Sequence, residues 1–258
     1  QIIATMLTQV RVNRIQQQTR DGAVVFVKKR RFGGSVVIWF GNWFLTLANS
    51  GIFMFVRTRD WLAWEDHCAR LLYPDRVAVR FEFENTVVIP EIRGVSLRHL
   101  VNSGEKNHMA FVAAAWELRR VHRIQCDDYS AAWSHGDLHL DNILYHSGTD
   151  QATLIDFDTR HERGLSETQR HADDLKTVLL ELLAMPDDQW SEPATCFLSD
   201  YGEAVALNEL NRQLVMPRGF ARILWYTRTG CSSIRETEQR LQQLQKIIHQ
   251  VIAADRTA

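Results

Sequence analysis

The stretch WSHGDLHLDNILY, residues 133–145, places five polar side chains directly before an apolar, strand-like segment. These side chains are His135, Asp137, His139, Asp141 and Asn142. A second apolar segment, ATLIDFD at 152–158, follows a short polar turn and ends on Asp156 and Asp158. Short apolar runs bounded by turn residues predict two strands joined as a hairpin. Such a hairpin would bring the polar loop before its first strand close to the carboxylates after its second.

Length and composition place the chain among ordinary globular proteins. The chain has 258 residues, of which 45% are apolar and 24% charged, enough to bury one large core or two lobes. Its cysteines, Cys68, Cys126, Cys196 and Cys231, lie far apart and form no CxxC pair. That usage suits a reducing compartment and argues against a zinc ribbon or a disulfide framework. We recognise no signal peptide, although the sequence does not begin with Met and an earlier segment is left open.

Positive charge is concentrated near the N-terminus. Residues 1–60 carry nine Lys and Arg against two Asp, whereas the whole chain has a net charge of −1. A basic segment favours phosphate ligands or an anionic surface as partner, and we expect no nucleic acid. From charge alone, a solvated face is the preferred interpretation.

The order of predicted elements indicates an α+β fold. Strands are predicted at 9–15, 23–29, 77–83 and 86–92, and helices at 59–72, 107–124, 171–185 and 236–254. Strands around one helix therefore precede the hairpin and a mostly helical remainder. We expect a small β-rich lobe at 1–92, with an apolar insert at 36–56, and a larger α-rich lobe at 93–258. A cleft between two such lobes is a common ligand site.

The spacing of Asp137, Asn142 and Asp156 suits phosphoryl transfer. This reaction needs an Asp that orients the attacking hydroxyl and accepts its proton, and oxygen ligands that hold a metal ion beside the phosphates. We expect Asp137 to be that base, and Asn142 and Asp156 to bind Mg²⁺, which prefers oxygen ligands. Asp137 and Asn142 stand five positions apart, as in the kinase catalytic loop H-R-D-x-x-x-x-N.

A metal-hydrolase interpretation would instead use His135 and His139 as ligands four positions apart. Gly136 disfavours a helix there, and no Glu follows the first His as in H-E-x-x-H. We therefore expect His135 to support the loop by hydrogen bonds, and we group it with Asp137 in the catalytic centre.

A lysine that binds phosphate is expected at the end of the strand 23–29. Lys28 and Lys29 are adjacent there, and only one can face the cleft because side chains alternate along a strand. Both strand faces are apolar, so periodicity does not decide; we favour Lys28, which ends a V-x-[VI]-K pattern first, and keep Lys29 open. The expected partner is Glu65 on the helix 59–72, with Asp66 as the weaker candidate. Glu91 completes the candidate nucleotide-binding set.

These motifs resemble known phosphotransferases. HGDLHLDN resembles the H-G-D-x-x-x-x-N loop of aminoglycoside and choline phosphotransferases. IDFD at 155–158 and KKRRFGG at 28–34 resemble lipopolysaccharide kinases, which phosphorylate Kdo or heptose of the inner core. The resemblance covers about residues 24–184. It implies a two-lobed protein-kinase-like fold, ATP and Mg²⁺ as cofactors, and transfer of the γ-phosphate to a hydroxyl, of a sugar on a lipopolysaccharide-like glycolipid or of a small molecule.

The same resemblance extends to HADDL at 171–175, which is similar to a helix whose buried Asp steadies the catalytic loop. It implies that role for Asp174, with Asp173 second, and a further supporting role for Asp158. An acidic pair at a helix N-terminus, favoured by the helix dipole, is the structural alternative.

Three features depart from protein kinases. No G-x-G-x-x-G loop precedes Lys28, and Gly136 stands where many protein kinases carry Arg. Eleven residues separate Asp158 from Arg170, with no A-P-E motif, which leaves little room for a segment that docks a protein substrate. A compact atypical protein kinase and a pseudokinase-like binding module therefore stand as alternatives.

The segment 36–56 contains no charged residue and has the length of a membrane span. A single span would separate Lys28 from Glu65, which must meet in one cleft. Two interpretations are left open: a segment packed on the small lobe, or an interfacial element in contact with an anionic membrane, which Trp39, Trp43 and the flanking positive charges suit. We expect a cytoplasmic protein, with peripheral attachment to the cytoplasmic face of the inner membrane under the second interpretation.

Overall fold

The first two strands form a hairpin with a two-residue turn, Asp21-Gly22. The computed structural model describes residues 12–75, 80–81, 86–105, 107–186, 189–229 and 233–255. Strand β1 (Asn13–Arg20) pairs antiparallel with β2 (Ala23–Arg30). Both turn residues have positive φ, 51° and 79°, which the tightest hairpin turns require and Asp-Gly readily adopts.

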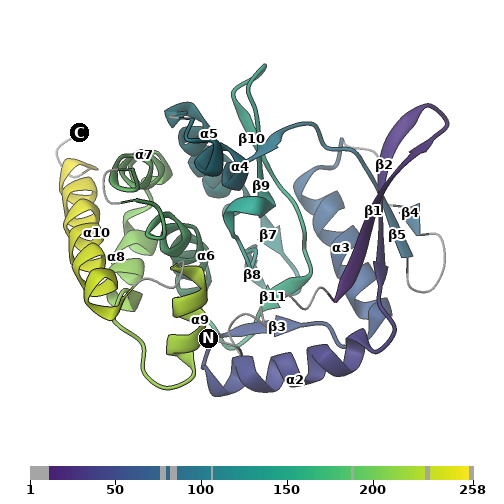
Figure 1. Ribbon diagram of the computed structural model, residues 1–258, viewed down its shortest axis with the longest axis horizontal. Helices are drawn as coiled ribbons and strands as arrows, with labels where there is room; N and C mark the ends of the chain where they lie inside the picture. The colour runs from purple at the N-terminus through teal and green to yellow at the C-terminus, as the bar shows by residue number, and fades with distance from the viewer. Residues whose placement is uncertain are drawn as a thin grey trace.

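The hairpin belongs to a four-stranded antiparallel sheet in the order β1-β2-β5-β4. The other strands are β5 (Thr86–Pro90) and β4 (Arg80–Phe81). Helix α3 (Thr58–Leu72) lies beside this sheet (Figure 1) and buries one face that includes Trp61, Glu65, Cys68 and Leu72. These positions recur at helical spacing, so one stripe of the helix enters the core.

The segment 36–56 forms a helix and a strand. Helix α2 (Gly34–Leu47) lies along the lower edge of the molecule in Figure 1, and β3 (Ile52–Met54) follows it. Within the helix only Gly34 and Ile38 are buried, whereas Ala48 and Phe55 are buried after it, so one side of the segment packs on the protein and the other faces solvent. Among the residues that the structure describes, no helix is long and apolar enough to cross a membrane.

The larger, later part of the chain is mostly helical. Its strands are β6 (Val95–Ser96), β7 (Gln125–Cys126), β8 (Ala131–Ala132), β9 (Ile143–His146), β10 (Gln151–Leu154) and β11 (Thr159–His161). Its helices are α4 (Leu97–Ser103), α5 (His108–Val121), the 3₁₀ turn η1 (Leu140–Asn142), α6 (Glu167–Leu182), α7 (Ser191–Tyr201), α8 (Ala204–Gln213), α9 (Ala221–Arg228) and α10 (Ile234–Asp255). Helix α5 packs against α7, and α6 against α8. This pairing encloses the apolar core.

Two short sheets hold the site region in place. Strands β10, β9 and β6 form one antiparallel sheet, and β11 pairs with β3, which ties the chain after the hairpin to the segment that follows α2. The chain passes from β5 to β6 through residues 91–94. We propose the boundary between the lobes there, at 92/93.

The α+β class, with a small β-rich lobe before a larger α-rich lobe, is as predicted. Helix α6 begins four residues before the predicted start because Ser166 and Gln169 form a capping box, in which each side chain bonds the other's backbone. Helix α4 was not predicted; Ser96 caps it by accepting from the amide of His99. Parts of the strands predicted at 9–15 and 77–83, the turn near 84–85 and Cys231 lie outside the described residues.

Candidate active site

The hairpin predicted after the polar loop is present and places the loop beside the carboxylates. Strands β9 and β10 pair from Ile143↔Leu154 to His146↔Gln151. The backbone amide of Ile155 donates to the carbonyl of Asn142 at 3.0 Å, and Asn142 Nδ2 donates to the carbonyl of Asp137 at 3.0 Å. Asp137, Asn142 and Asp156 therefore line one cleft, whose volume is about 1470 Å³.

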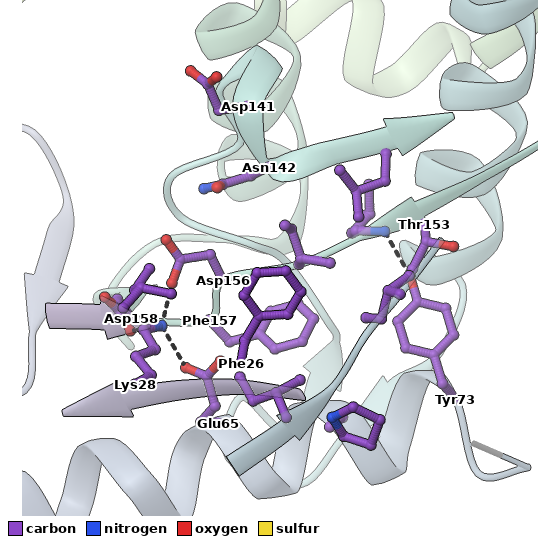
Figure 2. A pocket seen from close by; sticks show the side chains of 18 of the residues that line it. Phe26, Lys28, Glu65, Tyr73, Asp141, Asn142, Thr153, Asp156, Phe157 and Asp158 are labelled. Carbon is purple, nitrogen blue, oxygen red and sulfur yellow. Dashed lines mark hydrogen bonds and ion pairs between the residues drawn. The ribbon is translucent and has the colours of Figure 1, made fainter. Parts of the chain in front are cut away.

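Lys28 enters the same cleft from β2. It is 3% exposed, whereas its neighbour Lys29 points to solvent, as alternation along a strand requires. The Lys28 ammonium lies 3.2 Å from Glu65 Oε2 and 2.5 Å from Asp158 Oδ1, and it also pairs with Asp156 (Figure 2). One cation from the small lobe thus meets three carboxylates, one on α3 and two beyond β10.

Burial and crowding perturb these four groups. Burial raises the pKa of Glu65 to about 8, and the nearby Asp158 and Asp156 add to the rise that Lys28 opposes. Burial, followed by the charge of Asp156, also raises the pKa of Asp158. Burial disfavours the charged form of Asp156, yet the attraction of Lys28 lowers the pKa of this carboxyl. Burial also disfavours the charged form of Lys28, yet the three carboxylates raise its pKa.

The cluster fits a divalent cation. Oxygen atoms of Glu65, Asp156 and Asp158 all lie within 4.8 Å of one another. Glu65 is buried and the two aspartates are partly exposed, and hard oxygen donors are the ligands that Mg²⁺ prefers. Asp156, with the amide of Asn142 at the edge of the same cleft, is placed to hold such an ion beside a bound phosphate.

Asp158 belongs to the charge cluster, and its supporting role stays a prediction. Its Oδ1 accepts from Trp61 Nε1 at 2.6 Å and its Oδ2 from Asn13 Nδ2 at 2.7 Å, in addition to the Lys28 pair. Sequence reasoning missed Asn13 and Trp61. Neither belongs to a motif, and only the folded sheet brings β1 and α3 to this carboxylate.

Asp137 has a partner that the sequence did not indicate. Arg228, the last residue of α9, donates from Nη2 to Asp137 Oδ1 at 3.0 Å and from Nη1 to Thr177 Oγ1 at 2.5 Å. The Asp137 side chain is 35% exposed, so one oxygen is held while the group stays accessible from the cleft. No spacing rule connects a loop with a helix end 91 positions later.

Asp174 anchors the loop from behind. Its Oδ2 accepts from the amide of His135 at 2.7 Å, and its Oδ1 from the amide of Gly136 at 2.9 Å. His122 Nε2 lies 3.1 Å from the same carboxylate, which is fully buried. Burial acts to raise the pKa of Asp174, but the hydrogen bond from His122 and the nearby imidazoles lower it to about 2. Asp173 instead contacts His161 and Lys176.

The loop requires glycine at position 136. Gly136 has φ +88°, and an added Cβ would lie 3.0 Å from the carbonyl carbon of Arg160. A side chain there would be strained by conformation and by contact. The absence of the Arg that many protein kinases carry at this point therefore follows from the path of this backbone.

The other predicted site residues fall into two groups. His135 is buried behind the loop, with Nε2 3.0 Å from the carbonyl of Ile155; it does not line the cleft, which corrects its grouping with the catalytic base. Burial lowers the pKa of His135, so the ring stays neutral. Lys29 also lies outside the cleft, whereas Glu91 lines it.

Comparisons with known proteins give a distant likeness. No family model and no curated protein matches the chain. Among solved structures, an ethanolamine kinase of Plasmodium vivax is 14% identical with a TM-score of 0.49, over 94% of this chain and 85% of that chain. The ADP-bound aminoglycoside phosphotransferase APH(2'')-Ib is 10% identical with a TM-score of 0.44, over 97% and 98%.

A third structure, the streptomycin–ATP complex of APH(2'')-IIa, is 13% identical with a TM-score of 0.43, over 92% of this chain and 95% of that chain. All three TM-scores are below 0.5, so this likeness carries no weight in assigning a function. The assignment has to come from the residues of this chain.

Proposed function

We propose that this protein is a kinase with a protein-kinase-like arrangement of lobes, which transfers the γ-phosphate of ATP to a hydroxyl group. The observation that carries the proposal is the meeting of Lys28 with Glu65 and Asp156 in the cleft that Asp137 and Asn142 also line. If Lys28 formed an ion pair with a purely structural role, one carboxylate would be enough to balance its charge. Three carboxylates around one lysine, next to an accessible aspartate, suit a metal ion and phosphates.

Each side chain has a distinct part in the transfer. Lys28, held by Glu65, offers its positive charge to phosphate oxygens, and Asp156 and Asn142 hold Mg²⁺, which neutralises charge on the phosphates when it is bound. Asp137 orients the acceptor hydroxyl and accepts its proton as the oxygen attacks phosphorus. The Asp174 anchor keeps the loop that carries Asp137 in one conformation.

The acceptor that we propose is a sugar hydroxyl of a lipopolysaccharide-like glycolipid, reached from the cytoplasmic face of a membrane. Support comes from the exposed apolar face of α2. Phe44 of this helix packs against Phe220, just before α9, and the last residue of α9, Arg228, contacts Asp137. A compact atypical protein kinase is the second candidate. It is disfavoured because eleven residues between Asp158 and Arg170 leave little surface for docking a protein. A binding module without activity is disfavoured because base, lysine and metal positions are all filled.

A phosphate-transfer screen tests the proposal. Purified protein is incubated with γ-labelled ATP and Mg²⁺, together with glycolipid, free sugars, hydroxyl-bearing small molecules or generic protein substrates. We expect label in the glycolipid and none in protein. Asp137→Asn should abolish transfer with nucleotide affinity retained, and Asp156→Asn should weaken Mg²⁺-dependent nucleotide binding itself. Asp141→Asn, an exposed acid of the same loop, is the matched control and should stay active.

Three results would count against the proposal. Transfer that survives Asp137→Asn would show that Asp137 is not the base. Unchanged nucleotide affinity in Asp156→Asn would show that Asp156 is not a metal ligand. Label in protein substrates alone would favour the atypical protein kinase.

A further inference from the structure

Helix α2 turns an apolar face to solvent. Exposed side chains on this helix are Val36, Val37, Trp39, Phe40, Trp43 and Leu47. Trp39, Phe40 and Trp43 are each between 57% and 58% exposed, and Phe32, just before the helix, is fully exposed. The helix contains no charged residue. A contiguous exposed patch of this kind marks an interaction site in a folded protein.

The face continues onto the segment that leads to α9. Phe220, 46% exposed, packs edge-on against Phe44 of α2 with ring centroids 5.8 Å apart. Figure 1 shows α9 next to one end of α2 at the lower edge of the molecule. We call the residues named in these two paragraphs the α2–Phe220 face.

The charges around this face are positive. No Asp or Glu occurs in residues 22–59 or 210–235, the two segments that form it. Lys29 and Arg31 are exposed before the first turn of α2, and Arg218 and Arg222 are exposed on either side of Phe220. Glu162 lies beyond the C-terminal end of α2, where its amide donates to the carbonyl of Gly51.

We propose that the α2–Phe220 face docks on an anionic lipid bilayer. Aromatic and aliphatic side chains of a helix can enter the boundary between headgroups and acyl chains while flanking Lys and Arg bind anionic headgroups. A 14-residue helix is too short to span and lies in the plane of the interface instead. A second copy of the chain is the poorer partner, because pairing two such faces brings positive rims together without acidic residues to meet them.

The docking surface also indicates where the acceptor lies, an argument that rests on the proposed phosphotransferase function. Helix α9 starts next to Phe220 and ends on Arg228, which contacts Asp137. Its eight residues span about 12 Å at 1.5 Å per residue. A hydroxyl at Asp137 would then lie about one headgroup layer from the bilayer surface. The substrate class is a lipid whose accepting hydroxyl belongs to the headgroup.

Vesicle sedimentation without nucleotide tests the docking surface separately from catalysis. The full chain is mixed with vesicles of phosphatidylcholine alone or of phosphatidylcholine with phosphatidylglycerol. We expect binding to the mixed vesicles, at least about tenfold weaker binding to the neutral ones, and loss with added salt. The double variant Phe40→Gln/Trp43→Gln should lower the partition coefficient about tenfold or more with an unchanged thermal midpoint.

Trp116→Gln is the matched control, because this tryptophan is also exposed on a helix, α5, but lies outside the docking surface. It should bind vesicles like the parent. Lys29→Gln/Arg31→Gln should reduce binding to the mixed vesicles only.

Two outcomes would overturn the inference. One is a folded parent that sediments with neither vesicle. The other is a parent dimer in size-exclusion chromatography that Phe40→Gln/Trp43→Gln dissociates, since the face would then lie between copies. Nucleotide binding and transfer to a detergent-dispersed headgroup are measured in parallel. If transfer fails while vesicle binding holds, the proposed function is wrong and the docking surface stands.

Discussion

Arg228 Nη2 donates a hydrogen bond to Asp137 Oδ1 across 3.0 Å, and the two residues are 91 positions apart in the chain. The contact joins the last residue of α9 to the proposed catalytic base. Because Nη1 of the same guanidinium donates to Thr177 Oγ1 on α6, the side chain is fixed at both ends of its fork. The second oxygen of Asp137, Oδ2, lies 4.0 Å from His139 Nε2, and under the proposed function it is the one that meets the acceptor hydroxyl.

We expect Arg228→Ala to lower kcat about tenfold, since a hydrogen bond between charged groups contributes roughly 1.5–3 kcal/mol and fixes the carboxylate. KM for ATP should change less than about twofold, because the guanidinium contacts Asp137 and is not among the residues that line the cleft with Lys28 and Asp156. Steady-state kinetics, with each substrate varied in turn, measure the effects on kcat and on KM separately. Arg222→Ala, an exposed residue of the same helix, is the control. With an acceptor dispersed in detergent, this variant should have the kcat of the parent. A rise in kcat would show instead that Arg228 blocks the base.

Local sequence order was enough to predict the hairpin and its polar loop, since turn residues and apolar runs act over a few positions. It could not predict Arg228 or Asn13, which reach the site through tertiary packing over 91 and 145 positions. Periodicity also could not predict which of Lys28 and Lys29 faces the cleft, because both faces of β2 are apolar. Pairing with β1 and β5 decides it.

The apolar segment 36–56 shows another limit. Its apolar residues have no clear period, so the sequence allowed burial or exposure. Exposure of α2 follows from where β3 pairs with β11, which leaves one side of the helix without a covering element among the described residues. Long-range pairing of this kind leaves no local signal.

The ion pair of Lys28 and Glu65 should behave as one unit. Lys28→Ala and Glu65→Ala are each expected to weaken Mg²⁺-nucleotide binding about tenfold or more. The first leaves Glu65 buried without its cation, and the second removes the carboxylate that holds Lys28 from α3, so that the ammonium keeps only Asp156 and Asp158. The double variant should lose less nucleotide affinity than the product of the two single fold-losses, with an interaction free energy of roughly 0.5–3 kcal/mol. Calorimetric titration of the four proteins measures the cycle. Lys29→Ala is the control and should bind like the parent; additive effects in the cycle would argue against the pair.

Stability should fall in mild acid because of two stacked imidazoles. His122 and His171 are parallel, with ring centroids 3.8 Å apart. Burial, and next the neighbouring His122, lower the pKa of His171 to about 3. The unfolded chain binds this proton near pH 6.5 and the folded chain does not until about pH 3. The free energy of unfolding therefore decreases as pH falls between these values.

We expect His171→Gln to remove part of this dependence, on the order of a few kcal/mol at pH 4 relative to pH 7. Urea unfolding at several pH values measures the slope. His249→Gln, on the exposed side of α10, should leave the slope of the parent unchanged. An equal slope in His171→Gln and parent would exclude this histidine as the cause.

The choice between Asp174 and Asp173 can be decided by conservative substitution. Asp174→Asn replaces one of two acceptor oxygens by an NH₂ group, so one of the amides of His135 and Gly136 would face a donor inside the protein. Leaving a buried donor without an acceptor costs roughly 1–3 kcal/mol, and the lost charge adds to this. We expect a lower thermal midpoint and loss of turnover even at temperatures where the variant is folded. Asp173→Asn should also lower the midpoint, because the carboxylate pairs with His161 and Lys176, but it touches no amide of the catalytic loop and should keep turnover within about threefold. Thermal melts with kinetics below both midpoints separate a loss of stability from a loss of loop position. Equal turnover in the two folded variants would show that the Asp174 contacts support the core without setting the position of Asp137.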